Sequence, residues 1–120
     1  MATSHSLTPI WLVSHGTVLA SAVLATSRRD RRRGLSGVRV IEHPLVIQPC
    51  SWVHSFGMKT AIDVVHLNAQ GVVIATSHMK PWRVGPIIRQ ATLVIESAAG
   101  SLERWNIHVG DEIEVRHVEQ

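Results

Sequence analysis

Short runs of β-branched and aliphatic residues, bounded by glycine, proline or asparagine, are the feature that most limits how this 120-residue chain can fold. Two of them, 61–67 and 72–77, are joined by residues 68–71 (Asn-Ala-Gln-Gly), a four-residue turn typical of a β-hairpin. The same pattern predicts further strands at 10–13, 17–25, 45–47, 91–96 and 112–116. Six or more short strands of this kind indicate an all-β protein, a sandwich or a barrel.

Two short helices are predicted as insertions between the strands. Ser27, with Asp30 three residues later, resembles a capping box, and Gly34 ends the helix. This first helix has almost no apolar face, so we expect the rest of the fold to hold it in place. Ser101 is predicted to cap the second helix. Residues 80–90, with two prolines and one glycine, predict a long loop.

Composition predicts one globular domain. Hydrophobic residues make up 45% of the chain and charged residues 18%, enough apolar side chain for one core. Residues 1–9 are expected to be a flexible tail and residues 10–120 the domain. Cys50 is the only cysteine, which excludes an intrachain disulfide. The core must therefore form without one.

The apolar segment at residues 10–26 predicts neither a signal peptide nor a transmembrane segment. No lysine or arginine occurs in the first 27 residues, so the basic start of a signal peptide is missing. Ser14, His15 and Gly16 interrupt the run, which is too short to span a bilayer. We expect a soluble protein of the cytoplasm.

Several short motifs, taken in order, resemble the family called domain of unknown function 192. They are Arg31-x-Arg33-Gly34-Leu35, residues 50–58 (Cys-Ser-Trp-Val-His-Ser-Phe-Gly-Met), Ile62-Asp63-Val64-Val65, Gly71-x-Val73, Ala98-Ala99-Gly100-Ser101 and Val109-Gly110-Asp111. The resemblance covers roughly residues 17–116. It implies a β-sandwich of jelly-roll type with short helical insertions, and no established activity. Two residues depart from the family pattern: Ser36 stands where methionine is common, and His66 where an aromatic residue such as phenylalanine is usual.

Residues 50–58 are the most unusual segment of the chain. If the segment is extended, Cys50, Trp52, His54, Phe56 and Met58 share one face. That face is either the wall of a binding pocket or part of the core. As candidates for ligand binding we take Trp52, His54 and Met58, together with Trp82 from the long loop.

A catalytic site is the second hypothesis for this region. His54 could act as an acid or base, with Asp63 or Cys50 assisting. An extended segment would place Cys50 about 13 Å from His54, too far for a dyad. The eight histidines show no metal-binding spacing, so neither a metal nor another cofactor is predicted. Asp63, in an apolar run, is predicted either to face solvent or to be buried and paired, with Arg31 or Arg33 as a partner.

The basic charge of the chain is concentrated in residues 28–33. The net charge is +3, whereas this run alone carries +4. Five guanidinium groups could bind an anion or an acidic partner; they belong to Arg28, Arg29, Arg31, Arg32 and Arg33. The rest of the chain is close to neutral and no aromatic residue interrupts the run, so nucleic acid is not favoured.

These features predict three possible functions. The first is a non-enzymatic accessory domain that binds a small molecule, an ion or a partner beside residues 50–58. The second is a small enzyme that uses His54. The third is an adaptor that binds polyanions or proteins through Arg28 to Arg33.

Overall fold

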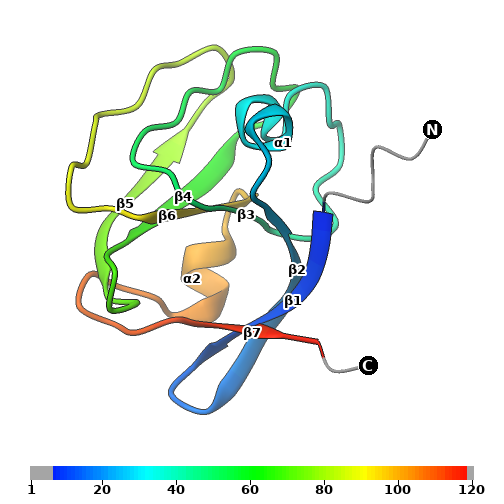
Figure 1. Ribbon diagram of the computed structural model, residues 1–120. Coiled ribbons are helices and arrows are strands. Elements are labelled where there is room, and N and C mark those ends of the chain that lie inside the picture. The colour runs from blue at the N-terminus through cyan, green and yellow to red at the C-terminus, as the bar shows by residue number, and fades with distance from the viewer. Residues whose placement is uncertain (1–6, 119–120) are drawn as a thin grey trace.

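The computed structural model describes residues 7–118, which form seven strands and two short helices (Figure 1). The elements are β1 (Leu7–Ser14), β2 (Thr17–Ala25), α1 (Arg28–Arg33), β3 (Leu45–Ile47), β4 (Ile62–Leu67), β5 (Val73–Met79), β6 (Leu93–Ala98), α2 (Ser101–Trp105) and β7 (Glu114–His117). The predicted mostly-β fold with two short helices is confirmed. Neither helix of residues 7–118 has the length and the apolar run needed to cross a membrane.

All seven strands belong to one mixed sheet with the order β5-β4-β6-β3-β2-β1-β7. The pair β2–β3 is parallel, and the other neighbours are antiparallel. The hairpin predicted at 61–77 is present as β4–β5. In its turn, the side-chain oxygen of Asn68 accepts hydrogen bonds from the backbone N–H groups of Gln70 and Val72, both at 3.0 Å.

The sheet curls until its two outer strands meet. Val72, just before β5, forms a β-bridge with Glu112, just before β7. The N–H of Val73 donates to the carbonyl of Asp111 at 2.8 Å, and the N–H of Ile113 donates to the carbonyl of Gly71 at 2.9 Å. The chain segments at both edges of the sheet thus find backbone partners across this seam, and the sheet encloses a core.

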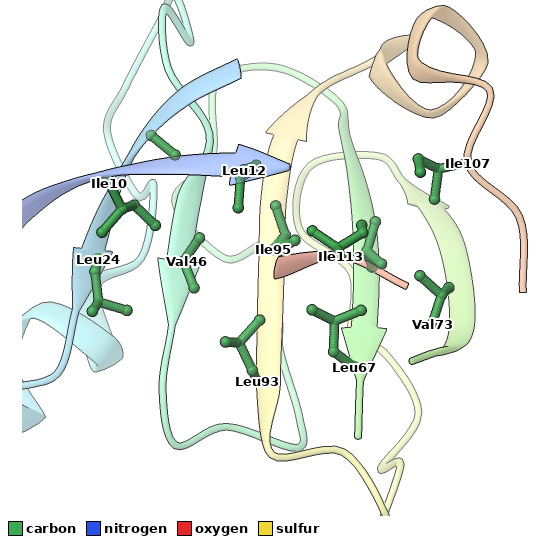
Figure 2. Close-up of a cluster of buried hydrophobic side chains, with 12 residues drawn as sticks. Ile10, Leu12, Leu24, Val46, Leu67, Val73, Leu93, Ile95, Ile107 and Ile113 are labelled. Carbon is green, nitrogen blue, oxygen red and sulfur yellow. The ribbon is translucent and has the colours of Figure 1, made fainter. Parts of the chain in front are cut away.

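Two hydrophobic clusters lie on opposite faces of the curled sheet. The first has members from strands β1 to β6 and is completed by Ile107 and Ile113, with Val115 of β7 packed against it, so it fills the inside of the curl (Figure 2). The second lies on the outer face of the central strands, where Leu35, Val53 and Met58 cover it. The covering residues come from the chain that follows α1 and from residues 50–58, so this outer cluster holds those segments against the sheet.

The structure corrects two boundary predictions. Strand β1 begins at Leu7, whose backbone pairs with Ala25, so residues 7–9 belong to the sheet and not to a tail. Residues 1–6 lie outside the described residues. The N-cap of α2 is Gly100, with a φ of 93°, and not Ser101. The hydroxyl of Ser101 instead donates to the carbonyl of Ala98 at 2.6 Å.

His66 lies in the middle of the sheet with no hydrogen-bond partner among the described residues for either ring nitrogen. His66 is 1% exposed, and burial lowers the pKa of its imidazole. An unpaired buried polar group destabilises the folded state. Because the unfolded state protonates this ring more readily, the destabilisation increases as the pH falls below about 6.5.

We therefore expect His66→Phe to raise the free energy of unfolding by about 2 kcal/mol at pH 5, and by less at pH 8. Urea unfolding of both proteins at the two pH values measures the difference. His117→Phe, at an exposed position in β7, is the control and should show no such pH dependence. An equal effect of His66→Phe at both pH values would contradict the assignment of a neutral, unpaired ring.

Candidate functional site

A cleft of about 140 Å³ lies between α1 and residues 50–58, over the outer face of the sheet. All five residues predicted to share one face of that segment line it: Cys50, Trp52, His54, Phe56 and Met58. The opposite wall is formed by residues 31–36 of α1 and its C-terminal end. The floor includes Ile47 of β3 and Glu96 of β6. The cleft therefore combines apolar, aromatic, cationic and acidic side chains.

Residues 50–58 are held in this orientation by hydrogen bonds of Val53 and Ser55 to the long loop. Ser55 is fully buried, and its hydroxyl donates to the carbonyl of Lys80 at 2.6 Å and accepts from the N–H of Arg83 at 2.7 Å. The N–H of Gly85 donates to the carbonyl of Val53 at 3.0 Å. The long loop predicted at 80–90 thus runs beside the segment and ties it down, which turns the intervening residues toward the cleft.

Four rings form an aromatic row: Trp52, His54 and Phe56 line the cleft, and Trp82 continues the row outside its lining. The ring of His54 lies 4.7 Å from that of Phe56 and 5.5 Å from that of Trp52, between centroids. Trp82, from the loop, lies 6.1 Å from Phe56. Trp52 and Phe56 are each 41% exposed. Such half-exposed ring faces can pack against a flat ligand.

The structure does not bring His54 and Asp63 together. Nδ1 of His54 accepts a hydrogen bond from the N–H of Phe56 at 3.2 Å, which fits a neutral ring protonated at Nε2. One carboxylate oxygen of Asp63 accepts from the N–H groups of Gly100 at 2.9 Å and Leu102 at 3.1 Å, and the other lies 3.0 Å from Nδ1 of His78. Asp63 therefore caps α2 from a neighbouring strand.

The expectation that Arg31 or Arg33 would pair with Asp63 is wrong. Nε of Arg31 donates to the carbonyl of Thr26 at 3.1 Å, and Nη1 donates to the carbonyl of Pro49 at 3.2 Å. The guanidinium of Arg31 consequently ties α1 to the chain that follows β3. Helix α1 itself begins and ends as predicted, with the hydroxyl of Ser27 accepting from the N–H of Asp30 at 3.1 Å and Gly34 at the C-cap.

Cys50 lies in the cleft as a partly buried thiol. Its Sγ donates to the carbonyl of Trp52 at 3.2 Å. Burial raises the pKa of the thiol, and the negative charge of Glu96 adds to this rise, although a hydrogen bond from the backbone of Trp52 and the charge of Arg31 oppose it. A raised pKa reduces the thiolate fraction, the opposite of what activates a nucleophilic cysteine.

We expect iodoacetamide at pH 8 to alkylate Cys50 at least tenfold more slowly in the folded protein than in the urea-unfolded chain. The rate can be followed by mass spectrometry, because the chain has one thiol. Free cysteine in the same urea solution corrects for the effect of the solvent. Alkylation of the folded protein at the rate of the unfolded chain would contradict the assignment of a protonated, shielded thiol.

Glu96 is the cleft residue that the sequence analysis missed. It is 3% exposed, and its Oε1 has no hydrogen-bond partner among the described residues. Burial raises the pKa of the carboxyl to about 7, although a backbone hydrogen bond from Leu35 opposes the rise. A Cβ atom at Gly34 would lie only 3.2 Å from Oε1, so a glycine at this position leaves room for the carboxylate.

The sequence does hold a signal for Glu96. It follows Leu93-Val94-Ile95, an apolar run that predicts a buried strand, where an acidic residue is unexpected. In the sheet, Glu96 lies on the central strand β6 between Leu45 of β3 and Val64 of β4. What the strand pattern could not reveal is that Oε1 of this carboxylate has no partner among the described residues.

A second hollow, of about 460 Å³, adjoins the cleft on the side of α1. Arg28, Arg31 and Arg32 line it, together with residues 49–52. Arg31, Arg32 and Trp52 line both hollows, so the two adjoin at these side chains. The arginine run predicted as an anion-binding patch therefore borders the aromatic row.

A larger hollow lies elsewhere. It measures about 730 Å³ and is formed at the seam of the sheet by residues 68–71 and 112–117. Among the described residues, none of the buried polar atoms without a partner belongs to its lining. Within residues 7–118, no group of three or more histidine, cysteine or acidic side chains could hold a metal ion. The 140 Å³ cleft is consequently the better candidate.

Comparison with proteins of known sequence gives relatives without an assigned function. A UPF0127 protein of Pyrococcus furiosus is 35% identical over 71 residues, which are 59% of this chain and 61% of that protein. A UPF0127 protein of Pyrococcus abyssi is 32% identical over 62 residues, 52% of this chain and 53% of that one. The aligned part is less than two thirds of either relative.

Two crystal structures have a similar fold. A protein of unknown function from Novosphingobium aromaticivorans has a TM-score of 0.72 and 16% identity over 90% of this chain and 84% of that one. A protein described as a putative transcription regulator, from Sinorhizobium meliloti, has a TM-score of 0.70 and 17% identity over 91% of this chain and 93% of that one. At these identities the likeness shows the fold alone.

The family resemblance carried by the sequence motifs is confirmed. The family model DUF192, described as an uncharacterized ACR, matches residues 3–115, nearly the whole chain. The chain belongs to the DUF192 family.

Proposed function

We propose that this protein is a non-enzymatic binding domain that holds a small organic ligand in the cleft between α1 and residues 50–58. The observation that carries the proposal is Glu96, a buried carboxyl group in the cleft whose Oε1 has no partner among the described residues. A hydrogen-bond donor on a ligand would satisfy that oxygen.

The cost of keeping Glu96 in this position supports a functional role. Most buried polar side-chain atoms in native proteins have a partner, and those without one commonly belong to functional sites. Burial raises the pKa of Glu96 to about 7, so its ionised form destabilises the fold at neutral pH. Proteins retain such destabilising groups where function needs them. The half-exposed rings of Trp52 and Phe56 beside it add a surface suited to a ligand.

The hypothesis of an enzyme has less support than a binding domain. Among the described residues, no carboxylate pairs with His54, and the carboxylate of Asp63 is bonded to the start of α2 and to His78. The thiol of Cys50 has a raised pKa, so it is poorly suited to attack a substrate. An enzyme built on His54 would therefore lack both the group that orients the base and an activated nucleophile.

A screen by nuclear magnetic resonance tests the proposal. We expect some small ring compounds to shift the indole N–H signal of Trp52 and the backbone amide signals of residues 50–58. Glu96→Gln should weaken the binding of these compounds at least tenfold, because one acceptor is replaced by a donor. Glu103→Gln, at an exposed position of α2, is the matched control and should bind as the unaltered protein does. Binding that is unchanged in Glu96→Gln would refute the proposal.

A further inference from the structure

We infer that the ligand of this cleft is a phosphorylated ring compound, with its ring against the aromatic row and its phosphate against the arginines of α1. This inference rests on the proposed function and adds the chemical class of the ligand. It follows from the size of the cleft, the position of Glu96 and the second hollow beside α1.

The size of the cleft fits a single ring. A cavity of about 150 Å³ in an apolar protein core is large enough for benzene, and this cleft measures about 140 Å³. Its lining offers apolar contacts from Leu35 and Ile47 and ring faces from Trp52 and Phe56. A six-membered ring can therefore occupy the cleft with one face on aromatic carbon.

Glu96 determines which chemical group of the ligand can lie next to it. Its unpartnered Oε1 requires a donor, an O–H or an N–H, on the edge of the ring. A carboxylate or a phosphate at the same depth would be repelled by the ionised form of Glu96 and would bury a second anion without a counter-charge. The anionic part of the ligand must therefore lie toward α1.

The second hollow supplies the site for that anionic part. Arg28, Arg31 and Arg32 are spaced i, i+3 and i+4 on α1, so their side chains lie on one face of the helix. Two bonds to backbone carbonyls fix the guanidinium of Arg31. Three guanidinium groups on one face match the several acceptor oxygens of a phosphate, which arginine binds in a bidentate manner.

Because the two hollows adjoin, one ligand that extends past the shared side chains can occupy both. Arg31, Arg32 and Trp52 border the cleft and the second hollow alike. A ring that is hydrogen-bonded to Glu96 would thus place its phosphate beyond Trp52, beside Arg28, with both parts in contact with the protein. Both nucleotides and sugar phosphates have this chemistry: a ring with donors at one edge and a phosphate on the other side.

Calorimetry with matched probes tests the inference. The phosphorylated probes are adenosine 5′-monophosphate, guanosine 5′-monophosphate and glucose 6-phosphate; adenosine, guanosine, glucose and inorganic phosphate are the references. We expect at least one phosphorylated probe to bind tenfold or more tightly than its unphosphorylated counterpart and than inorganic phosphate. Which of them binds distinguishes a nucleotide from a sugar phosphate.

Two variants locate the phosphate and the ring. Arg28→Gln combined with Arg32→Gln should remove the advantage of the phosphorylated probe and most of its salt dependence. Glu96→Gln should weaken the binding of the phosphorylated and the unphosphorylated probes to the same extent. The binding of inorganic phosphate should not change. Arg39→Gln combined with Arg89→Gln, both at exposed positions outside either hollow, is the control and should change nothing.

The outcomes separate this inference from the proposed function. If unphosphorylated rings shift the signals of Trp52 and residues 50–58 but phosphorylation gives no gain, the ligand class is wrong and the binding domain stands. If inorganic phosphate binds as tightly as the phosphorylated rings, the ring site is wrong. If none of these probes binds, the inference fails, and the wider screen decides the proposed function.

Discussion

Replacing Glu96 with glutamine should stabilise the folded protein progressively as the pH rises from 4 to 8. Burial raises the pKa of this carboxyl from 4.5 to about 7 in the folded state. Below pH 4.5 the group is protonated in both states, so its titration does not change the free energy of unfolding. Between pH 4.5 and 7 the unfolded chain loses the proton while the folded protein keeps it, so the free energy of unfolding falls. Above pH 7 the loss is complete, at about 3 kcal/mol.

Urea unfolding at pH 4 and pH 8 measures this change. We expect the difference between Glu96→Gln and the unaltered protein to be about 3 kcal/mol larger at pH 8 than at pH 4. Any effect of the amide that does not depend on pH cancels in this comparison, and so does the titration of His66, which both proteins share. Glu103→Gln should show no such trend, because Glu103 is exposed. A difference independent of pH would mean that Glu96 is not a buried, protonatable carboxyl.

Replacing Asp63 with alanine should have the largest destabilising effect among the substitutions considered. Its carboxylate accepts hydrogen bonds from the N–H groups of Gly100 and Leu102, and its side chain is only 7% exposed. Alanine would leave both N–H groups without this acceptor at the start of α2, where the helix has no cap of its own. Two such bonds to a charged group suggest a loss of about 3 kcal/mol.

Two further variants separate the helix cap from the contact with His78. Asp63→Asn keeps an acceptor oxygen for the helix and should lose less than half as much as Asp63→Ala. His78→Ala removes only a partner whose side chain is 55% exposed, so its effect should stay below about 1 kcal/mol. The midpoints of urea unfolding at pH 7 compare the three. A loss below about 1 kcal/mol for Asp63→Ala would refute the cap.

The parts of the fold that the sequence predicted correctly are those with a local physical cause. The hairpin β4–β5 depends on a turn in which Asn68 bonds to backbone groups two and four residues later. Helix α1 depends on Ser27 and Gly34 at its ends. Each of these contacts joins residues close in the chain, so their types and spacing suffice to recognise it.

The features that the sequence did not predict depend on contacts between distant residues. The cap of α2 comes from Asp63, 37 residues before Gly100. The early start of β1 depends on Leu7 pairing with Ala25 in the curled sheet. No local pattern specifies either partner, because many strand orders would satisfy the same alternation of apolar and polar residues.

The candidate site was predictable to a similar extent. Alternation along residues 50–58 correctly placed five residues on a common surface, and the bonds of Val53 and Ser55 to the loop at residues 80–90 hold the segment in that orientation. Neither Glu96 nor the position of α1 across the cleft could be read from this pattern. The segments that form the two walls and the floor are far apart in the sequence, and the curl of the sheet brings them together.

The pairing of β1 with β7 has a consequence for how the chain reaches its fold during synthesis. Strand β1 emerges from the ribosome before β7, and one of its two edges stays open until residues 114–117 have been made and Ile10 can pair with His117. A β1–β2 hairpin with an uncovered apolar face is therefore expected to persist in the nascent chain. Contacts of such long sequence separation also favour slow folding. Chaperones that bind exposed apolar segments are therefore expected to bind this hairpin.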